Sequence, residues 1–271
     1  MFGQLLREPR IIFGSGFIII LILLAVSAPI IAPYDPTLMH PSDILKGPSK
    51  RFLLGTDLFG RDILSQIIFG SRVSLLISFS SICFALCVGS ALGMISGYFG
   101  SKYEFFIMRT MDVLLSFPPL FLAIAAVAIL GPGIYQLILI IGILYVPTFA
   151  RVVYSYTKSI IQNTYIEAAR AVGCSDLRIM RTCVFPNIRA VLCVQFTFSV
   201  AFAILIEAGM SFLGLGVQPP TPSWGAMVAD LQSYIFNQPL AVLWPAIAIS
   251  LTILAINLAG HSLQDIFCVK Q

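Results

Sequence analysis

The sequence predicts an all-α protein that crosses a membrane with six transmembrane helices. Hydrophobic residues make up 58% of the 271 residues and charged residues only 10%, and the mean hydropathy is +0.96. These values exclude an ordinary water-soluble domain. A helix that crosses the roughly 30 Å hydrocarbon core needs about 20 apolar residues. The chain contains six apolar runs of suitable length, separated by polar or glycine- and proline-rich segments.

The first apolar run covers residues 11–31 and follows a short segment that carries Arg7 and Arg10. A secretory signal would have a shorter apolar core and then a cleavage site of small residues. This run is long enough to span a membrane and ends in Ala-Pro-Tyr-Asp-Pro. We therefore expect an uncleaved first span, with residues 1–72 comprising an N-terminal tail, this span and an extracytoplasmic loop.

The end of that loop, residues 55–74, mixes charged and apolar side chains. The apolar residues recur at helical spacing, which predicts an amphipathic helix lying on the outer membrane surface before the second span. Such a helix would serve either as a membrane-surface anchor or as a docking surface for an extracytoplasmic binding protein. Under the second interpretation, Arg61 and Asp62 are the candidate docking residues.

Five further spans are predicted in residues 73–271, which form the core of the protein. A tight break at residues 131–133, Gly-Pro-Gly, separates the second and third of these spans, so the two are expected to form an antiparallel pair. The five spans cover residues 73–97, 113–130, 134–154, 188–213 and 239–260.

Of the residues in these spans, Glu207 has the highest free-energy cost of insertion into the membrane, because this acidic residue lies well inside the run 188–213. An acidic side chain at membrane depth normally faces a cavity or a partner. One hypothesis is that Glu207 lines a translocation pathway and meets a positively charged group of the cargo. The other is that it makes a structural hydrogen bond to a neighbouring helix.

The distribution of basic residues predicts that both termini are cytoplasmic. Cytoplasmic loops of membrane proteins are enriched in Lys and Arg. With the N-terminus inside, eleven of the 16 basic residues fall on the cytoplasmic side, and the other five share one outer loop. The cytoplasmic residues are Arg7, Arg10, Lys102, Arg109, Arg151, Lys158, Arg170, Arg178, Arg181, Arg189 and Lys270, and the outer ones are Lys46, Lys50, Arg51, Arg61 and Arg72.

The polar segment 155–187, between the fourth and fifth spans, carries local helix signals. Thr164 and Glu167 have the spacing of a capping box, which predicts a short helix that starts at Tyr165. Gly173 suits the left-handed conformation that ends a helix.

A second short helix is expected after this glycine. Ser175 is placed to cap it, residues 176–184 form it, and Pro186 is expected to stop it. The segment is therefore predicted to be two short helices joined by a glycine turn at the cytoplasmic surface.

The spacing of residues in this segment resembles a motif of a known family. Glu-Ala-Ala at 167–169, three residues, Gly173, nine residues and then Cys-Val-Phe-Pro at 183–186 resemble the EAA loop of permease subunits of bacterial ABC importers, which ends in I-x-L-P. The two departures, at 183 and 185, keep the apolar character. The resemblance implies that the first short helix sits in a cleft of a separate ATP-hydrolysing subunit. The residues it assigns to coupling are Glu167, Ala168, Ala169, Gly173 and Pro186.

Three further blocks are similar to those of the dipeptide, oligopeptide and nickel permeases. They are GTDLFGRDILS with GSRVSL in residues 55–75, SFLGLG at 211–216 and PPTPSWG at 219–225. The chain is identified on these blocks as the second, "C" type, permease of a pair. The resemblance implies a type I ABC importer permease fold, half of a translocation pathway, and alternating access driven by ATP hydrolysis elsewhere. Di- or oligopeptides are the favoured cargo, with nickel or a metal chelate as the alternative.

The same resemblance implies the partners and the location. They are a second homologous permease, two ATP-binding subunits that hold ATP and Mg²⁺, an extracytoplasmic substrate-binding protein and the lipid bilayer of the bacterial cytoplasmic (inner) membrane. No nucleic acid is expected.

The chain itself is expected to be neither an enzyme nor a metalloprotein. It has no GxxxxGK[ST] loop to hold a nucleotide, no HExxH and no intramembrane aspartate pair. The six cysteines form no CxxC pair and are expected to be reduced packing residues. We therefore expect no cofactor and no metal in this chain. An intramembrane enzyme and an ion-coupled secondary transporter are the competing classes, but Glu207 alone is thin support for ion coupling.

Overall fold

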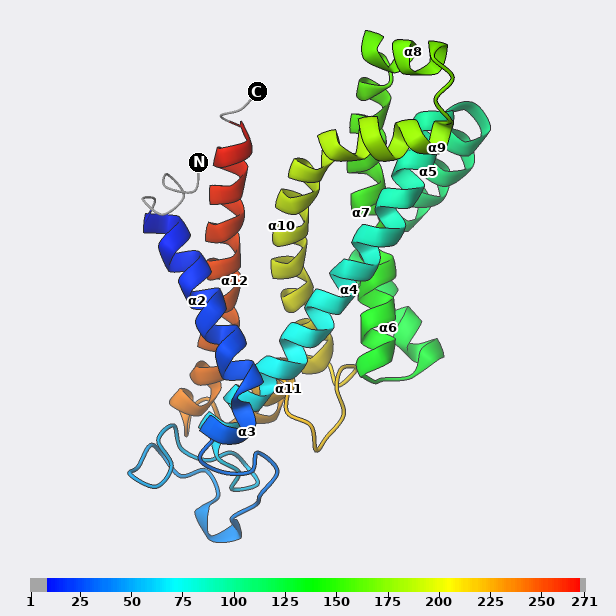
Figure 1. Ribbon diagram of the computed structural model, residues 1–271. Helices are drawn as coiled ribbons and strands as arrows, with labels where there is room; N and C mark the ends of the chain where they lie inside the picture. The colour runs from blue at the N-terminus through cyan, green and yellow to red at the C-terminus, as the bar shows by residue number, and fades with distance from the viewer. Residues whose placement is uncertain (1–8, 269–271) are drawn as a thin grey trace.

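The computed structural model describes residues 9–268, and every regular element in that range is a helix. The longer elements are α2 (Pro9–Val26), α4 (Ile63–Phe99), α5 (Ser101–Leu115), α6 (Pro119–Leu130), α7 (Ile134–Ile160), α10 (Phe185–Phe212) and α12 (Pro239–Cys268) (Figure 1). The shorter ones are α3 (Ala28–Ile31), η1 (Pro41–Asp43), α8 (Thr164–Ala171), α9 (Asp176–Ile179), η2 (Met180–Val184), α11 (Trp224–Leu231) and η3 (Gln232–Tyr234). The all-α prediction is confirmed for the described residues.

Four continuous helical stretches in the described range are long and apolar enough to cross a membrane: Ile63–Phe99, Ile134–Ile160, Asp176–Phe212 and Pro239–Asp265. The bent pair α5 and α6 is a fifth candidate if it counts as one span. The apolar stretch Gly14–Val26 of α2 is shorter. Length and composition thus support four or five spans where the sequence predicts six.

The predicted surface helix before the second span is wrong. Helix α4 begins at Ile63 and runs for 37 residues without a break to Phe99, so the amphipathic stretch is the first part of the span itself. The Asp62 side chain caps this helix by accepting a hydrogen bond from the Ser65 backbone N–H at 2.8 Å. Gly70 lies where the two parts meet, but it keeps a helical backbone, and α4 contains no proline, so the helix does not stop where the hydrophobicity changes.

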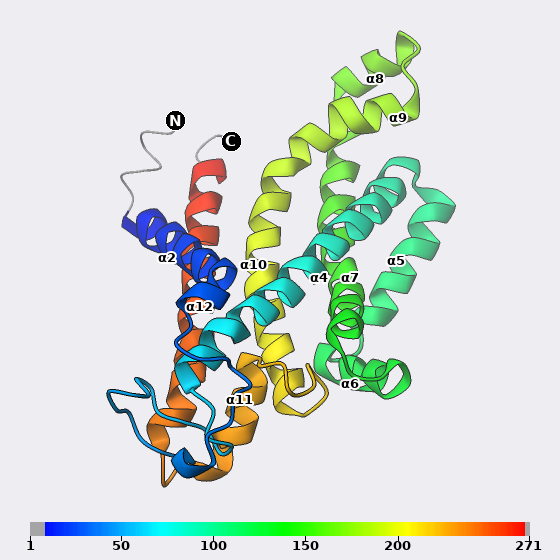
Figure 2. The same cartoon turned by 60° about the horizontal axis from the view of Figure 1, so that its bottom comes forward.

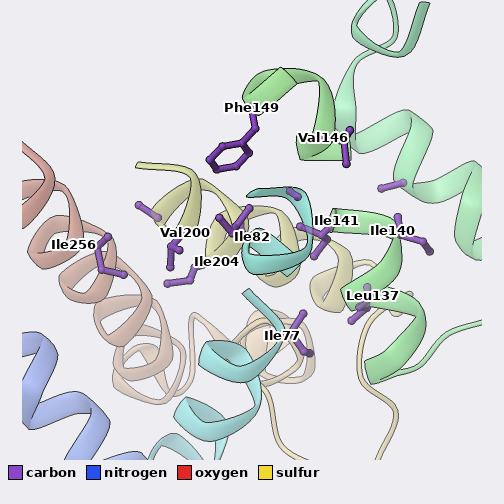
Figure 3. Packing of buried hydrophobic residues seen from close by; sticks show 14 of the residues in the cluster. Ile77, Ile82, Leu137, Ile140, Ile141, Val146, Phe149, Val200, Ile204 and Ile256 are labelled. Atoms are coloured by element: carbon purple, nitrogen blue, oxygen red, sulfur yellow. The ribbon is translucent and has the colours of Figure 1, made fainter. Parts of the chain in front are cut away.

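Helices α4 and α7 pack closely along the half of α4 that is nearer to α8. A Cβ atom added at Gly93 would lie 2.4 Å from the Ala150 carbonyl oxygen, and one at Gly97 would lie 2.8 Å from Thr157 Cβ. The two backbones therefore approach at a distance that only glycine permits. Buried apolar residues, several of which Figure 3 shows, fill the space between α4, α7, α10 and α12.

The third predicted span is broken. The axes of α5 and α6 differ by 94°, and the chain turns at residues 116–118 before α6 starts at Pro119. Polar contacts hold α5 to α7 near its start and near its end. Lys158 Nζ lies 2.7 Å from Glu104 Oε1, and Arg151 Nη2 lies 2.5 Å from Asp112 Oδ1.

Both ends of the described chain lie at the same end of the bundle as α8 and α9. Figures 1 and 2 show the start of α2, the end of α12 and the α8–α9 segment at one end, with the loop between α3 and α4 and helix α11 at the other. This arrangement agrees with the prediction that the termini and segment 155–187 share one side of the membrane.

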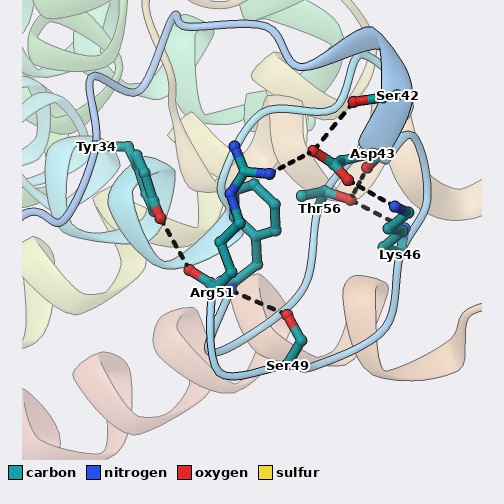
Figure 4. A network of polar contacts seen from close by, with 8 residues as sticks. Tyr34, Ser42, Asp43, Lys46, Ser49, Arg51 and Thr56 are labelled. Atoms are coloured by element: carbon teal, nitrogen blue, oxygen red, sulfur yellow. Dashed lines mark hydrogen bonds and ion pairs between the residues drawn. The ribbon is translucent and has the colours of Figure 1, made fainter.

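The loop between α3 and α4 is held together by its own polar contacts. The Asp43 carboxylate accepts hydrogen bonds from Lys46 Nζ at 2.6 Å and Arg51 Nη1 at 3.2 Å, while the Tyr34 hydroxyl donates to the Arg51 carbonyl (Figure 4). The Lys46 hydrogen bond holds the pKa of Asp43 below its usual value. The loop is therefore an ordered structure at the end of the bundle opposite to α8.

Candidate functional site

Helices α8 and α9 project beyond the ends of the neighbouring long helices and expose apolar residues at their tip. Val172 is 80% exposed and Leu177 is 72% exposed, whereas Ile166 and Ile179 are fully buried beneath them. A small apolar tip carried on a buried apolar base is suited to insertion into another protein.

The predicted coupling residues lie on this projection. Glu167, Ala168 and Gly173 are exposed, while Ala169 is half-buried against the base. Glu167 lies in the first turn of α8, where its negative charge complements the helix dipole.

Gly173 ends α8 in the way that the sequence predicts. Its φ is +80°, a left-handed conformation that glycine adopts without strain. The N–H of Cys174 bonds the Ala169 carbonyl at 3.1 Å, and the N–H of Gly173 bonds the Arg170 carbonyl at 2.9 Å. This pair of bonds is a Schellman motif, and it fixes the direction in which α9 leaves α8.

Both predicted side-chain caps are absent. Helix α8 begins one residue early, at Thr164, with Asn163 at the N-cap position, and neither Asn163 nor Ser175 caps with its side chain. Asn163 instead donates from Nδ2 to the Ile160 carbonyl at the end of α7. Because α7 runs to Ile160 and not to Tyr154, the connection is too short to place Thr164 outside the helix.

Pro186 does not stop the second short helix. Helix α9 passes through the π-helical turn η2 into α10, and Pro186 is the second residue of α10. The Phe185 N–H bonds the Met180 carbonyl, five residues back. A proline cannot donate the bond to the fourth residue back, and the wider π turn before it lets the chain continue as helix. Pro186 is exposed and lies at the foot of the projection.

Glu207 is fully buried within the subunit. Its Oε1 accepts a hydrogen bond from the Ser211 hydroxyl at 2.8 Å, one turn further along α10, and its Oε2 has no partner. This hydrogen bond lies within α10, and the side chain of Ser74, on the neighbouring helix α4, faces the same carboxylate. A direct contact with cargo would require the surrounding helices to move.

Arg61 and Asp62, the predicted docking residues, are both buried. Arg61 Nε lies 2.6 Å from Asp57 Oδ2, and Arg61 Nη2 lies 3.5 Å from Asp230 Oδ2 on α11. The Asp62 carboxylate accepts hydrogen bonds from both the backbone N–H and the hydroxyl of Ser65. Both side chains thus hold the outer loop to α4 and α11, so a docking protein would meet the loop they support rather than the side chains.

A cavity of about 150 Å³ lies beside this ion-pair group. Arg61, Gln66 and Asp230 line one side, and the proline-rich segment 219–222 lines another. Burial raises the pKa of Asp230, against the opposing effect of Arg61. The sequence did not single out Gln66 or Asp230, and only the i, i+4 spacing of Asp57 and Arg61 signalled an ion pair in advance.

Among residues 9–268, no group of three or more His, Cys, Asp or Glu side chains is placed to hold a metal ion. The five described cysteines are all free.

Two family models match the sequence. Residues 89–268 match the binding-protein-dependent transport system inner membrane component, and residues 1–48 match the N-terminal TM domain of oligopeptide transport permease C. The first match covers more than half of the chain. The chain belongs to this family of binding-protein-dependent transport permeases. It is a permease subunit of an ABC importer, as the EAA-like segment indicates.

Curated relatives of this permease agree with the assignment. It is 44% identical to the di/tripeptide transport system permease protein DppC of Pseudomonas aeruginosa over 93% of this chain and 85% of the relative. It is 40% identical to the dipeptide permease DppC of Alkalihalophilus pseudofirmus, over 97% and 87% of the two chains. The glutathione transport system permease protein GsiD of Escherichia coli O157:H7 is 41% identical over 96% and 86%.

The fold of the permease also has a match among solved structures. An inward-facing MetNI methionine ABC transporter superposes with a TM-score of 0.60 at 18% identity, over 73% of this chain and 94% of the other. At this identity the match shows the fold alone, and it confirms the type I importer permease fold.

Proposed function

We propose that this permease forms half of the pathway of a peptide importer, and that α8 couples it to a separate ATP-hydrolysing subunit. The observation that carries this proposal is the exposed tip at Val172 and Leu177 with Glu167 beside it. A membrane subunit without a nucleotide-binding loop must receive its energy through a contact of this kind.

Peptides are the proposed cargo. The relatives are named for dipeptides, di- and tripeptides or glutathione, which is itself a peptide. Nothing in these relatives supports the nickel alternative, and the described residues offer no metal-binding group.

The remaining parts of the importer follow from the family. A second homologous permease completes the pathway, two ATP-binding subunits hold ATP and Mg²⁺, and an extracytoplasmic binding protein delivers the peptide. The permease lies in the bacterial inner membrane with α8, the start of α2 and the end of α12 on the cytoplasmic side. The loop between α3 and α4 and helix α11 then face the binding protein. Contact of Glu207 with cargo stays a prediction.

The coupling role is tested by two matched glycine variants. Gly173 and Gly131 have φ of +80° and +78°, and a Cβ added at either meets nothing within 4 Å. Gly173→Val strains a left-handed backbone by roughly 1–2 kcal/mol, and Gly131→Val, where ψ is 166°, strains the backbone by at least as much at the opposite end of the bundle. We expect only Gly173→Val to reduce the peptide transported per ATP hydrolysed by the reconstituted importer.

The measurement is uptake of labelled dipeptide and release of phosphate in the same proteoliposomes, with nickel uptake measured alongside. Equal effects of the two variants would show that α8 has no special role in coupling. Uptake of nickel without uptake of peptide would refute the cargo.

A further inference from the structure

The aromatic side chain of Tyr98 joins α4 to the α8–α9 projection. Tyr98 is the second-last residue of α4 and is only 7% exposed. Its hydroxyl donates a hydrogen bond of 2.7 Å to Oδ1 of Asp176, the first residue of α9. The guanidinium of Arg170, in the last turn of α8, lies 5.3 Å from the centroid of the Tyr98 ring. One side chain thus contacts both helices that flank the Gly173 turn.

These contacts attach the projection to the part of α4 that packs closely on α7. Gly97, beside Tyr98, lies so close to Thr157 that any added Cβ would collide with α7. The last turn of α4 therefore cannot shift against α7 without separating the two helices, because close-packed backbones leave no free space.

Helix α4 also reaches the opposite face of the membrane domain. Its 37 residues correspond to about 55 Å at 1.5 Å per residue. Near its outer end the Ile67 carbonyl accepts a hydrogen bond of 3.0 Å from the indole N–H of Trp224 on α11, and Gln66 lines the outer cavity. A displacement at Tyr98 is thus applied to a single helix that ends at the outer cavity.

We propose that Tyr98 is a positioning residue for energy coupling, whose hydrogen bond to Asp176 transmits movement of the α8–α9 projection to α4. This inference rests on the coupling role proposed above for α8. Tyr98 does not touch cargo or nucleotide. It holds Asp176 and Arg170 in a fixed relation to α4, so that a push on the projection moves the membrane helix and does not only tilt the loop.

The test separates the hydroxyl from the ring. Tyr98→Phe keeps the ring beneath Arg170 and removes the donor, and Asp176→Ala removes the acceptor. Asp176→Asn keeps an acceptor oxygen. Tyr156→Phe is the matched control, because Tyr156 is an exposed tyrosine of α7 near the same end of the bundle and its hydroxyl makes no hydrogen bond to the described residues. All variants are purified as the complete importer and reconstituted in proteoliposomes.

We expect Tyr98→Phe and Asp176→Ala each to reduce peptide transported per ATP by about twofold to tenfold, since one hydrogen bond is lost. The double variant is expected to be no worse than either single variant, and Asp176→Asn and Tyr156→Phe to couple like the wild type. Melting temperature and subunit composition are measured in parallel, and neither is expected to change enough to account for the loss.

The inference is overturned if Tyr98→Phe transports as much peptide per ATP as the wild type, or if its effect adds to that of Asp176→Ala. Both results leave the role of α8 intact, provided that Gly173→Val still uncouples. A wild-type complex that transports peptide without any ATP-hydrolysing subunit would instead refute the proposed function itself.

Discussion

Trp224 shows how a single residue fixes helix α11 against the long helices. Its side chain is 1% exposed, and its indole N–H donates to the Ile67 carbonyl on α4. Gly70 lies directly opposite, where an added Cβ would come within 3.1 Å of the indole ring. Trp244, on α12, is a contrasting case, because its buried indole N–H has no hydrogen-bond partner. The indole N–H of Trp224 is therefore hydrogen-bonded, whereas the buried indole N–H of Trp244 is not.

The two residues are expected to respond differently to the same substitution. Trp224→Phe removes the hydrogen bond to the Ile67 carbonyl, which keeps its bond within α4, and should lower stability by about 0.5–1.5 kcal/mol. Trp244→Phe removes a buried donor that bonds nothing, and should cost less or even stabilise the fold. Thermal unfolding of the detergent-purified protein measures both. A larger loss for Trp244→Phe would contradict this account.

At the scale of elements, the sequence predicts those features that depend on local chemistry. Gly173 ends α8 because a positive φ is a property of the residue itself. The predictions of a separate surface helix at 55–74 and of a helix end at Pro186 are both wrong for a related reason. A change of hydrophobicity does not by itself end a helix, and a proline does not end one where the preceding turn widens to a π turn. In both places the long helix simply continues.

Within the candidate site, the role of Tyr98 had no signal in the sequence. An aromatic residue at the end of an apolar run is typical of a membrane interface. Its partner Asp176 lies 78 positions further along the chain, and only the fold brings the two together. The proposed coupling residues, in contrast, were found in the sequence because their motif is contiguous, and their role stays a prediction.

The packing of α4 on α7 gives a prediction at the same scale. Gly93→Ala places a Cβ 2.4 Å from the Ala150 carbonyl oxygen, whereas Gly209→Ala on α10 meets its nearest neighbour only at 4.0 Å. We expect the first substitution to cost about 1–3 kcal/mol through overpacking and the second to be neutral or slightly stabilising, since alanine favours helix. Melting temperatures of the two variants compare them directly, and equal values would show that the helices separate without cost.

At the scale of the whole molecule, the polar loop and the α8–α9 projection lie at opposite ends of the bundle (Figures 1 and 2). The basic residues predict which end is cytoplasmic, because most of them cluster near α8 and the termini. The fold alone gives the relation between the two ends but not the direction of insertion.

Cysteine labelling determines that direction. In a variant whose native cysteines are replaced by serine or alanine, Lys50→Cys and Lys102→Cys each introduce one exposed thiol, in the loop between α3 and α4 and at the start of α5. A membrane-impermeant maleimide added to intact cells should label the first and not the second. Inside-out vesicles should give the reverse pattern, and the opposite result in both preparations would invert the proposed orientation.

The ion pair between Arg61 and Asp230 joins positions 169 residues apart, and this separation has a consequence for biosynthesis. The ribosome adds about 5–20 residues per second, so the start of α4 waits roughly ten to thirty seconds for the partner that covers it. During that interval a buried arginine and its aspartate neighbours have been translocated but are still incomplete. In the proposed orientation, the outer end of the bundle is therefore completed only after α11 has been made, and a ribosome that stalls before α11 leaves this end open to proteases on that side of the membrane.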